Sequence, residues 1–201
     1  MVRTEKDFAG GCPRSNENPP LPQKKYKTIY ADPPWNEMGG GKICRGAQAH
    51  YNLMKTEEIM ALPIKSIAED NCHLYLWTTN NFLPDALRVI NAWGFVYKTM
   101  ITWPKHKIGL GQYFRGMTEH CLFAVRGCLP YKIKDGKRCQ GRTLIETSPL
   151  FENRREHSQK PEEMRQMIEI VSYPPYIELF ARGKILGWDV WGKEAAQGVM
   201  I

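Results

Sequence analysis

The sequence predicts a single α/β domain with a mostly parallel central sheet and helices on both faces. Two observations support this fold class. Residues 72–79 form an apolar run typical of a buried strand, residues 82–93 carry apolar side chains at helical spacing, and residues 95–103 return to a strand pattern. Strand, helix and strand in this order are typical of a parallel sheet. A length of 201 residues suits one domain with a substantial core and is short for two.

The chain begins with a polar stretch that glycine and proline interrupt repeatedly, so we expect residues 1–25 to form an irregular N-terminal arm. Residues 26–201 would then form one domain. Its first strand is expected over 26–31, where the side chains alternate in character. The strand ends abruptly at Asp32-Pro33-Pro34-Trp35, because each proline fixes its own φ and removes a backbone N–H group.

Two more elements are expected in the middle of the chain. Thr56 is the expected N-cap of a short helix that ends near Pro63. Residues 119–125, of which the last five are apolar, predict another strand. The basic stretch over 131–142 is expected to be a solvated hairpin or loop that contacts phosphates rather than a segment that reads bases.

The C-terminal part predicts one helix and two strands. Pro161 suits the first helical position, and the residues after it give a helical apolar face that extends to Val171. A strand follows over 176–182, and a terminal strand is expected over 187–194. These elements complete the alternation of strands and helices that an α/β sheet requires.

The composition restricts the class of protein. The six cysteines form no C-x-x-C pair, and several lie in apolar runs, so we interpret them as reduced thiols of a cytoplasmic protein. The spacing of His120 and the cysteines that follow it does not suit zinc, and no metal is expected. The longest apolar runs fall far short of the ~20 residues that a membrane span needs, and the start lacks the apolar region of a secretory signal.

Positive charge is concentrated in one segment. The formal net charge is +7, and residues 98–142 alone carry ten Lys/Arg against Asp135 and Glu119, a local balance of +8. The rest of the chain is therefore close to neutral. Positive charge gathered in this way is typical of proteins that bind a polyanion, and it favours nucleic acid as the partner.

The strand end at 32–35 offers acceptors for an amino group. The two prolines make the peptide rigid, so its carbonyl groups are expected to stay free beside a carboxylate. An exocyclic amino group has two N–H donors, and Asp32 can supply one acceptor and the Pro33 carbonyl the other. The ring of Trp35 is expected to stack on a flat base. An isolated Asp-Pro-Pro sequence is more often a simple turn after a strand, so the rest of the chain must decide.

The tetrapeptide resembles the catalytic motif of methyltransferases that act on adenine N6. With tryptophan in fourth place it is similar to the family named after the mRNA N6-adenosine methyltransferase, which also has small bacterial and phage members. The resemblance extends from Tyr26 to Glu194 and implies a Rossmann-like class I methyltransferase fold with a permuted order, the catalytic motif before the cofactor motif. It implies methyl transfer from S-adenosylmethionine to adenine N6 in nucleic acid, DNA more than RNA, with Asp32, Pro33, Pro34 and Trp35 as catalytic residues.

The resemblance also places the cofactor. Lys160-Pro161 is similar to the family element that takes the cofactor carboxylate, and a lysine at a helix N-terminus suits an anion. The strand over 176–182 resembles the family strand Glu-Leu-Phe-small-Arg, whose arginine reaches the ribose. Lys193 departs from the asparagine of many members. The implied cofactor-binding residues are Asp32, Lys160, Glu178, Phe180, Arg182, Lys193 and Glu194.

The acceptor side is expected in two basic regions. Residues 36–50 would form a loop that closes over the acceptor base. Their Gly39-Gly40-Gly41-Lys42 stretch does not fit a phosphate-binding loop, because Ile43 stands where that motif needs Ser or Thr after the lysine. A basic insert at about 104–155 would contact phosphates. The expected nucleic-acid-binding residues are Lys42, Arg45, Tyr51, Lys105, Lys107, Arg115, Lys132, Lys134, Lys137 and Arg138.

Two alternatives remain open from the sequence. The same fold could methylate another amino group, such as cytosine N4 or a protein glutamine. The chain could also be a non-catalytic nucleic-acid-binding partner of an active methyltransferase. We expect no membrane partner, a monomer or homodimer, and a preference for unpaired adenine, because flipping a base out of a duplex costs a few kcal/mol.

Overall fold

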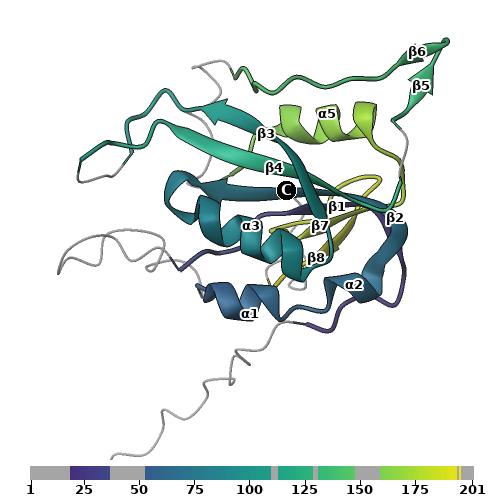
Figure 1. Ribbon diagram of the computed structural model, residues 1–201, viewed down its shortest axis with the longest axis horizontal. Coiled ribbons are helices and arrows are strands. Elements are labelled where there is room, and N and C mark those ends of the chain that lie inside the picture. Colours follow the sequence, from purple (N-terminus) through teal and green to yellow (C-terminus); the bar gives the residue numbers. More distant parts are fainter. Residues whose placement is uncertain are drawn as a thin grey trace, which may run out of the picture.

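The computed structural model describes residues 19–36, 53–109, 113–128, 131–147, 159–193 and 195. Its centre is a six-stranded sheet with the strand order β3-β4-β2-β1-β7-β8 (Figure 1). The strands of this sheet are β1 (Tyr26–Ala31), β2 (Ala68–Thr79), β3 (Val96–Pro104), β4 (Thr118–Arg126), β7 (Tyr176–Leu179) and β8 (Asp189–Trp191).

Strand β1 lies inside the sheet and sets the direction of most of it. It pairs in parallel with β2 and β7, and β7 pairs in parallel with β8. Strand β4 runs antiparallel between β2 and β3. The mostly parallel sheet is confirmed. The predicted unit over 72–103 is present as β2, a helix and β3, but β4 separates its two strands, because a segment later in the chain inserts between them.

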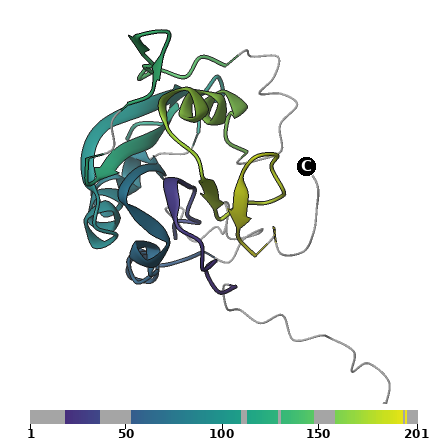
Figure 2. The ribbon, with the colours of Figure 1, turned by 90° about the vertical axis from the view of Figure 1, so that its right-hand side faces the viewer.

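Helices cover both faces of the sheet, as predicted (Figures 1 and 2). Helices α1 (Thr56–Met60), α2 (Ile64–Ile67) and α3 (Leu83–Ala92) supply side chains to one apolar core, and the 3₁₀ turn η2 (Asn80–Phe82) leads into α3. Helix α5 (Glu162–Val171) covers the other face, where Met164 and Ile168 are fully buried. Strand β1 and the 72–78 part of β2 are therefore covered on both faces, which explains the apolar runs in the sequence.

Two predicted helix starts are displaced by one residue. The N-cap of α1 is Lys55, whose backbone N–H donates to a carboxylate oxygen of Glu58 at 2.7 Å, and Thr56 is the first helical residue. Pro161 has an extended ψ of 135° and is the N-cap of α5 rather than its first helical residue. The predicted stop of α3 is confirmed, since Gly94 follows it with a φ of 78°, a conformation that favours glycine.

The basic stretch after β4, for which a hairpin or a loop was predicted, forms a hairpin. It consists of β5 (Ile133–Lys134) and β6 (Lys137–Arg138). Asp135 and Gly136 form the turn with φ values of 52° and 73°, which matches the left-handed turn that short hairpins prefer. The hairpin pairs with no other strand of the described chain.

Part of the predicted N-terminal arm lies against β8. Residues 19–25 contain no helix or strand. The Pro19 carbonyl accepts a hydrogen bond from the Trp191 indole, and Lys24 forms an ion pair with Asp189. Residues 1–18 lie outside the described part of the chain, so the extent of the arm stays a prediction. Among the described residues, no helix is long and apolar enough to cross a membrane.

Candidate active site

The candidate site lies at the carboxyl end of β1, where the chain leaves the sheet between β2 and β7. The Trp35 N–H donates to the Pro33 carbonyl at 2.9 Å, and the Met54 N–H donates to the Pro34 carbonyl at 2.8 Å. The expectation that both carbonyls stay free is therefore wrong, because the chain folds back on itself after the prolines. A carbonyl oxygen has two lone pairs, so the Pro33 oxygen can still accept a second hydrogen bond.

The ring of Trp35 is packed into the core and is only 7% exposed. It stacks on Phe82 with ring centroids 5.5 Å apart, and its indole N–H donates to the Trp77 carbonyl at 3.0 Å. The predicted role as an open platform for a base does not fit this geometry. The ring instead fixes the segment 32–35 against the turn η2, because tryptophan combines a large apolar surface with one donor that needs a partner.

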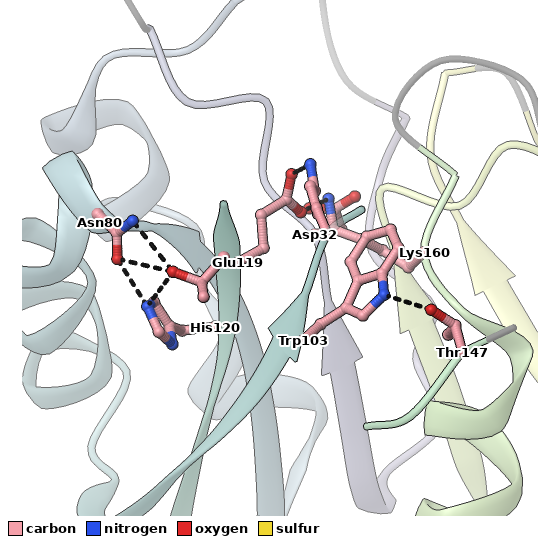
Figure 3. A network of polar contacts seen from close by, with 9 residues as sticks. Asp32, Asn80, Trp103, Glu119, His120, Thr147 and Lys160 are labelled. Atoms are coloured by element: carbon pink, nitrogen blue, oxygen red, sulfur yellow. Dashed lines mark hydrogen bonds and ion pairs between the residues drawn. The ribbon is translucent and has the colours of Figure 1, made fainter. Parts of the chain in front are cut away.

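A lysine connects two carboxylates beside this strand end (Figure 3). Lys160 Nζ lies 2.9 Å from Asp32 Oδ1 and 3.2 Å from Glu119 Oε2. The other oxygen of Glu119 pairs with Lys105. These side chains come from distant elements: the end of β1, the start of β4, the residue before the α5 N-cap and the segment after β3. Positive and negative charges alternate, so the cluster is close to neutral.

The cluster determines the protonation of its members. Burial raises the pKa of Asp32 above its ordinary value, although the Lys160 charge opposes this. Burial would also raise the pKa of Glu119, but Lys160 and Lys105 outweigh it and hold the pKa of Glu119 below its ordinary value. Burial lowers the pKa of Lys160, but the two carboxylates outweigh it and leave that pKa raised. Lys160 is therefore a permanently charged centre.

The arrangement leaves defined capacity for ligands. An ammonium group has three N–H donors, and Lys160 directs two of them to Asp32 and Glu119, which leaves one for a further acceptor. Only one oxygen of Asp32 is engaged by Lys160. Asp32 Oδ2 and the second lone pair of the Pro33 carbonyl can thus each accept a further N–H donor.

Strand β7 ends next to Asp32, whose N–H donates to the Leu179 carbonyl. The cofactor strand predicted over 176–182 is therefore too long, because residues 180–182 leave the sheet in a turn. Glu178 is paired with Arg165 of α5 at 2.9 Å, so its charge is already compensated by the protein. Phe180 adopts a positive φ of 63° and packs edge-on against Trp191 at 5.3 Å. A non-glycine residue in this conformation is strained, and such strain is frequent at functional sites.

Of the other predicted cofactor residues, the two that the structure describes, Arg182 and Lys193, lie at this same end of the sheet. Burial raises the pKa of Asp32, and Arg182 is close enough for its charge to oppose that rise. Lys193 follows β8, whose end approaches the β7 turn so closely that a Cβ on Gly192 would lie 2.5 Å from the Ala181 oxygen. Glu194 lies outside the described residues. The described part of the chain has no group of three or more His, Cys, Asp or Glu side chains that could hold a metal ion.

Glu119 was not predicted as a site residue. The sequence placed it only at the start of an expected strand and among the charges of the basic segment. Because β4 is antiparallel, its first residues lie beside the carboxyl ends of β1 and β2. The neighbouring His120 is held by two polar contacts: its Nε2 lies 2.6 Å from Asn80 Oδ1 (Figure 3), and its Nδ1 lies 3.2 Å from Thr102 Oγ1. A charged residue directly before a buried run was the only signal available.

The predicted nucleic-acid-binding residues fall into separate groups. Lys105 contacts Glu119 at the site, while Lys107 and Arg115 lie exposed in the segment between β3 and β4. The residues of the hairpin lie elsewhere, where Lys132 contacts Tyr176 at the start of β7. The other three expected contacts, Lys42, Arg45 and Tyr51, lie outside the described residues.

Comparison with known proteins adds a family to this geometry. Residues 26–194 match the model of the family described as MT-A70. The chain is 34% identical over 198 residues to the type II methyltransferase M.MunI of Mycoplasma sp, an alignment that covers 88% of this chain and 80% of that protein.

Longer relatives match over a part of their length. An N(6)-adenosine-methyltransferase MT-A70-like protein of Arabidopsis thaliana is 26% identical, over 78% of this chain and 22% of its own. The N(6)-adenine-specific methyltransferase METTL4 of Homo sapiens is 27% identical, over 86% of this chain and 38% of its own. The chain thus spans well under half of each of these two relatives.

Proposed function

Because the chain belongs to the MT-A70 family and is an adenine-N6 methyltransferase that acts on DNA or RNA, we propose that it uses S-adenosylmethionine as methyl donor and DNA as its main substrate. The observation that carries the proposal is the contact of Asp32 with Lys160 at the carboxyl end of β1. Asp32 can accept a hydrogen bond from the adenine amino group, and Lys160 beside it can bind the carboxylate of the cofactor. DNA is favoured because the chain covers most of a type II methyltransferase at 34% identity, whereas a relative named for adenosine is 26% identical.

The cofactor is assigned to the ends of β7 and β8. When bound, it supplies an electrophilic methyl group on a sulfonium. The third N–H of Lys160 suits its carboxylate, because a charge-assisted hydrogen bond to an ammonium is strong in a half-buried site. Phe180 and Arg182 at the end of β7, with Lys193 after β8, would contact the remainder, and Glu178 would act through its pair with Arg165. The cofactor contact expected of Glu194, which lies outside the described residues, stays a prediction.

Asp32 and Pro33 position the acceptor. The N6 lone pair of adenine is delocalised into the ring, so the free amino group is a poor nucleophile. Hydrogen bonds from its two N–H groups to Asp32 Oδ2 and the Pro33 carbonyl would favour a tetrahedral nitrogen and localise the pair for in-line attack. The N–C bond forms as the C–S bond breaks, and no covalent enzyme intermediate is needed. Catalysis of this kind is positioning with electrostatic stabilisation.

Asp32 is also suited to receive the proton that the reaction releases. The nitrogen is cationic after methyl transfer and must lose one proton. Asp32 already holds that N–H in a hydrogen bond, and burial raises the pKa of its carboxyl group, which makes it a better base than an exposed aspartate. The proton can then pass to solvent, because the side chain is 24% exposed.

Glu119 is proposed as a positioning residue for this site. It takes one donor of Lys160, so the ammonium bridges the two carboxylates instead of closing on Asp32 alone. Lys105 holds the other oxygen of Glu119 and limits its movement. Asp32 therefore keeps one oxygen for the substrate.

Transfer of labelled methyl from S-adenosylmethionine to oligonucleotides with a single adenine tests the proposal. We expect label in DNA strands that contain adenine, less label in the matching RNA, and none in strands whose adenine is replaced by cytosine or guanine. Label in the cytosine strands would favour the alternative of another amino group. Absence of transfer with intact S-adenosylmethionine binding would favour a non-catalytic partner. We further propose that the protein is cytoplasmic. We also propose that it is a monomer or a homodimer, and sedimentation measures this oligomeric state.

A further inference from the structure

The basic hairpin, defined as residues 131–138, lies at the end of the sheet opposite to Asp32. Its Lys132 Nζ donates to the Glu169 carbonyl at 2.5 Å and to the Tyr176 hydroxyl at 3.1 Å. Tyr176 is the first residue of β7 and pairs with Thr28 of β1. In Figure 1 the hairpin projects past one end of the sheet, whereas the arrowhead of β3, which leads to Lys105, points to the other end.

The separation between hairpin and site can be bounded from the strand register. Thr28 lies four residues before Asp32, and a parallel strand rises ~3.3 Å per residue, so the anchor at Tyr176 is about 13 Å from the site along the strand. The hairpin extends further outward from this anchor. Phosphates follow one another every ~3.4 Å along the axis of a B-form helix, so the distance corresponds to roughly four phosphates there and to fewer along an extended single strand.

Lys132 fixes the hairpin to the domain. Besides its two hydrogen bonds, its ammonium lies 5.6 Å and 5.8 Å from the ring centroids of Tyr173 and Tyr176. The Tyr173 hydroxyl donates to the Tyr131 carbonyl at 3.3 Å. The expected phosphate contact of Lys132 is therefore replaced by an anchoring role, because its donors are directed to α5 and β7.

The three remaining cations of the hairpin are exposed to solvent, and Asp135 in the turn is the one acidic residue of the hairpin. Lys134 and Lys137 lie directly opposite each other across the two strands, and both are exposed. Arg138 lies over the Tyr131 ring at 4.4 Å. Among the described residues, no carboxylate forms an ion pair with any of these three cations. Like charges directly opposite in a hairpin are destabilising, and a bound anion would remove this repulsion.

We infer that Lys134, Lys137 and Arg138 bind phosphates of the substrate strand that lie about 13 Å or more from the target adenine. This inference rests on the proposed function. Arg138 and Tyr131 also present a stacked cation and ring, a combination that suits a nucleic-acid strand better than an acidic peptide. The substrate strand would thus run along one side of the domain from the site to the basic hairpin.

A length series of single-stranded DNA tests the inference. Strands with one adenine are shortened from the 5′ side or from the 3′ side of that base, and their Kd is measured by fluorescence anisotropy over a range of salt. The Lys134→Ala/Lys137→Ala variant is compared with wild type and with Lys25→Ala/Lys65→Ala, which removes two exposed lysines outside the hairpin. Thermal melting checks the folding of each variant.

We expect the hairpin variant to bind long strands roughly tenfold more weakly than wild type, with a salt slope shallower by about 1.4 for two lost contacts. The ratio of the two Kd values should fall towards one as the strand is shortened from one side only. The control variant should match wild type at every length. A ratio that does not depend on length, or a ratio of one at all lengths, would overturn the inference.

The two failures can be told apart. If wild type transfers label to adenine but the hairpin variant shows no length dependence, the proposed function stands and the extended contact is wrong. If wild type binds no strand of any length and transfers no label, both are wrong.

Discussion

Lys160 Nζ lies 2.9 Å from Asp32 Oδ1, although 128 positions separate the two residues in the sequence. The contact joins the start of α5 to the end of β1. It places the expected cation for the cofactor carboxylate directly beside the expected acceptor for the adenine amino group. The residue expected to bind the methyl donor and the residue expected to bind the acceptor base therefore form one ion pair.

Replacing Lys160 should weaken cofactor binding. Lys160→Ala removes the charge-assisted hydrogen bond to the carboxylate and leaves two carboxylates without their shared cation. We expect the dissociation constant for S-adenosylmethionine to rise by an amount that corresponds to about 1.5–3 kcal/mol, while affinity for DNA changes little. Calorimetry measures the first and anisotropy the second, with the exposed Lys65→Ala as control. Cofactor binding at wild-type strength would show that the carboxylate lies elsewhere.

Glu119→Gln should alter both activity and the acid stability of the protein. The amide leaves Lys160 free to close on Asp32, so we expect kcat to fall while the KM for S-adenosylmethionine changes less. Glu119→Asp, which restores the charge, should recover part of the rate. A purely structural role would not produce this split between kcat and KM.

The pH dependence of unfolding gives a second readout for Glu119. Its pKa is lowered in the folded state, so the unfolded chain takes up a proton at acidic pH before the folded chain does. The stability that Glu119 contributes is present above its ordinary pKa and is lost as the pH falls through the lowered folded value. Wild type should therefore lose more stability than Glu119→Gln between neutral and acidic pH, as measured by urea unfolding. Equal losses would contradict the assigned ion pairs.

Trp35→Ala should act on stability before it acts on substrate binding. The substitution removes a buried ring that stacks on Phe82 and donates to Trp77, so we expect a loss of about 3–5 kcal/mol in the free energy of unfolding. Denaturant unfolding measures it, and Trp35→Phe should lose less because it keeps the stacking. A variant with wild-type stability and weakened binding of adenine strands would support the base-stacking role that the sequence predicted.

The sequence was sufficient for the strand and motif at the centre of the site, because the strand over 26–31 and the prolines after it are local signals. Lys160 was also found, from a helix start and a resemblance. Glu119 was not, because only the insertion of the antiparallel β4 beside β2 brings it to Asp32. The burial of Trp35 and the distance of the hairpin likewise depend on packing between segments far apart in the chain. Local patterns carry no information on such contacts.

The most direct test of the account is the rate of methyl transfer by Asp32 variants. Transfer of labelled methyl to a DNA strand with one adenine should fall by at least ~10²-fold in Asp32→Ala, the scale for loss of one positioned polar contact. Asp32→Asn keeps an acceptor oxygen without the charge and should give an intermediate rate. Asp70→Ala removes an exposed aspartate and should match wild type. A folded Asp32→Ala protein that methylates adenine at the wild-type rate would contradict the account and leave Asp32 as a turn residue.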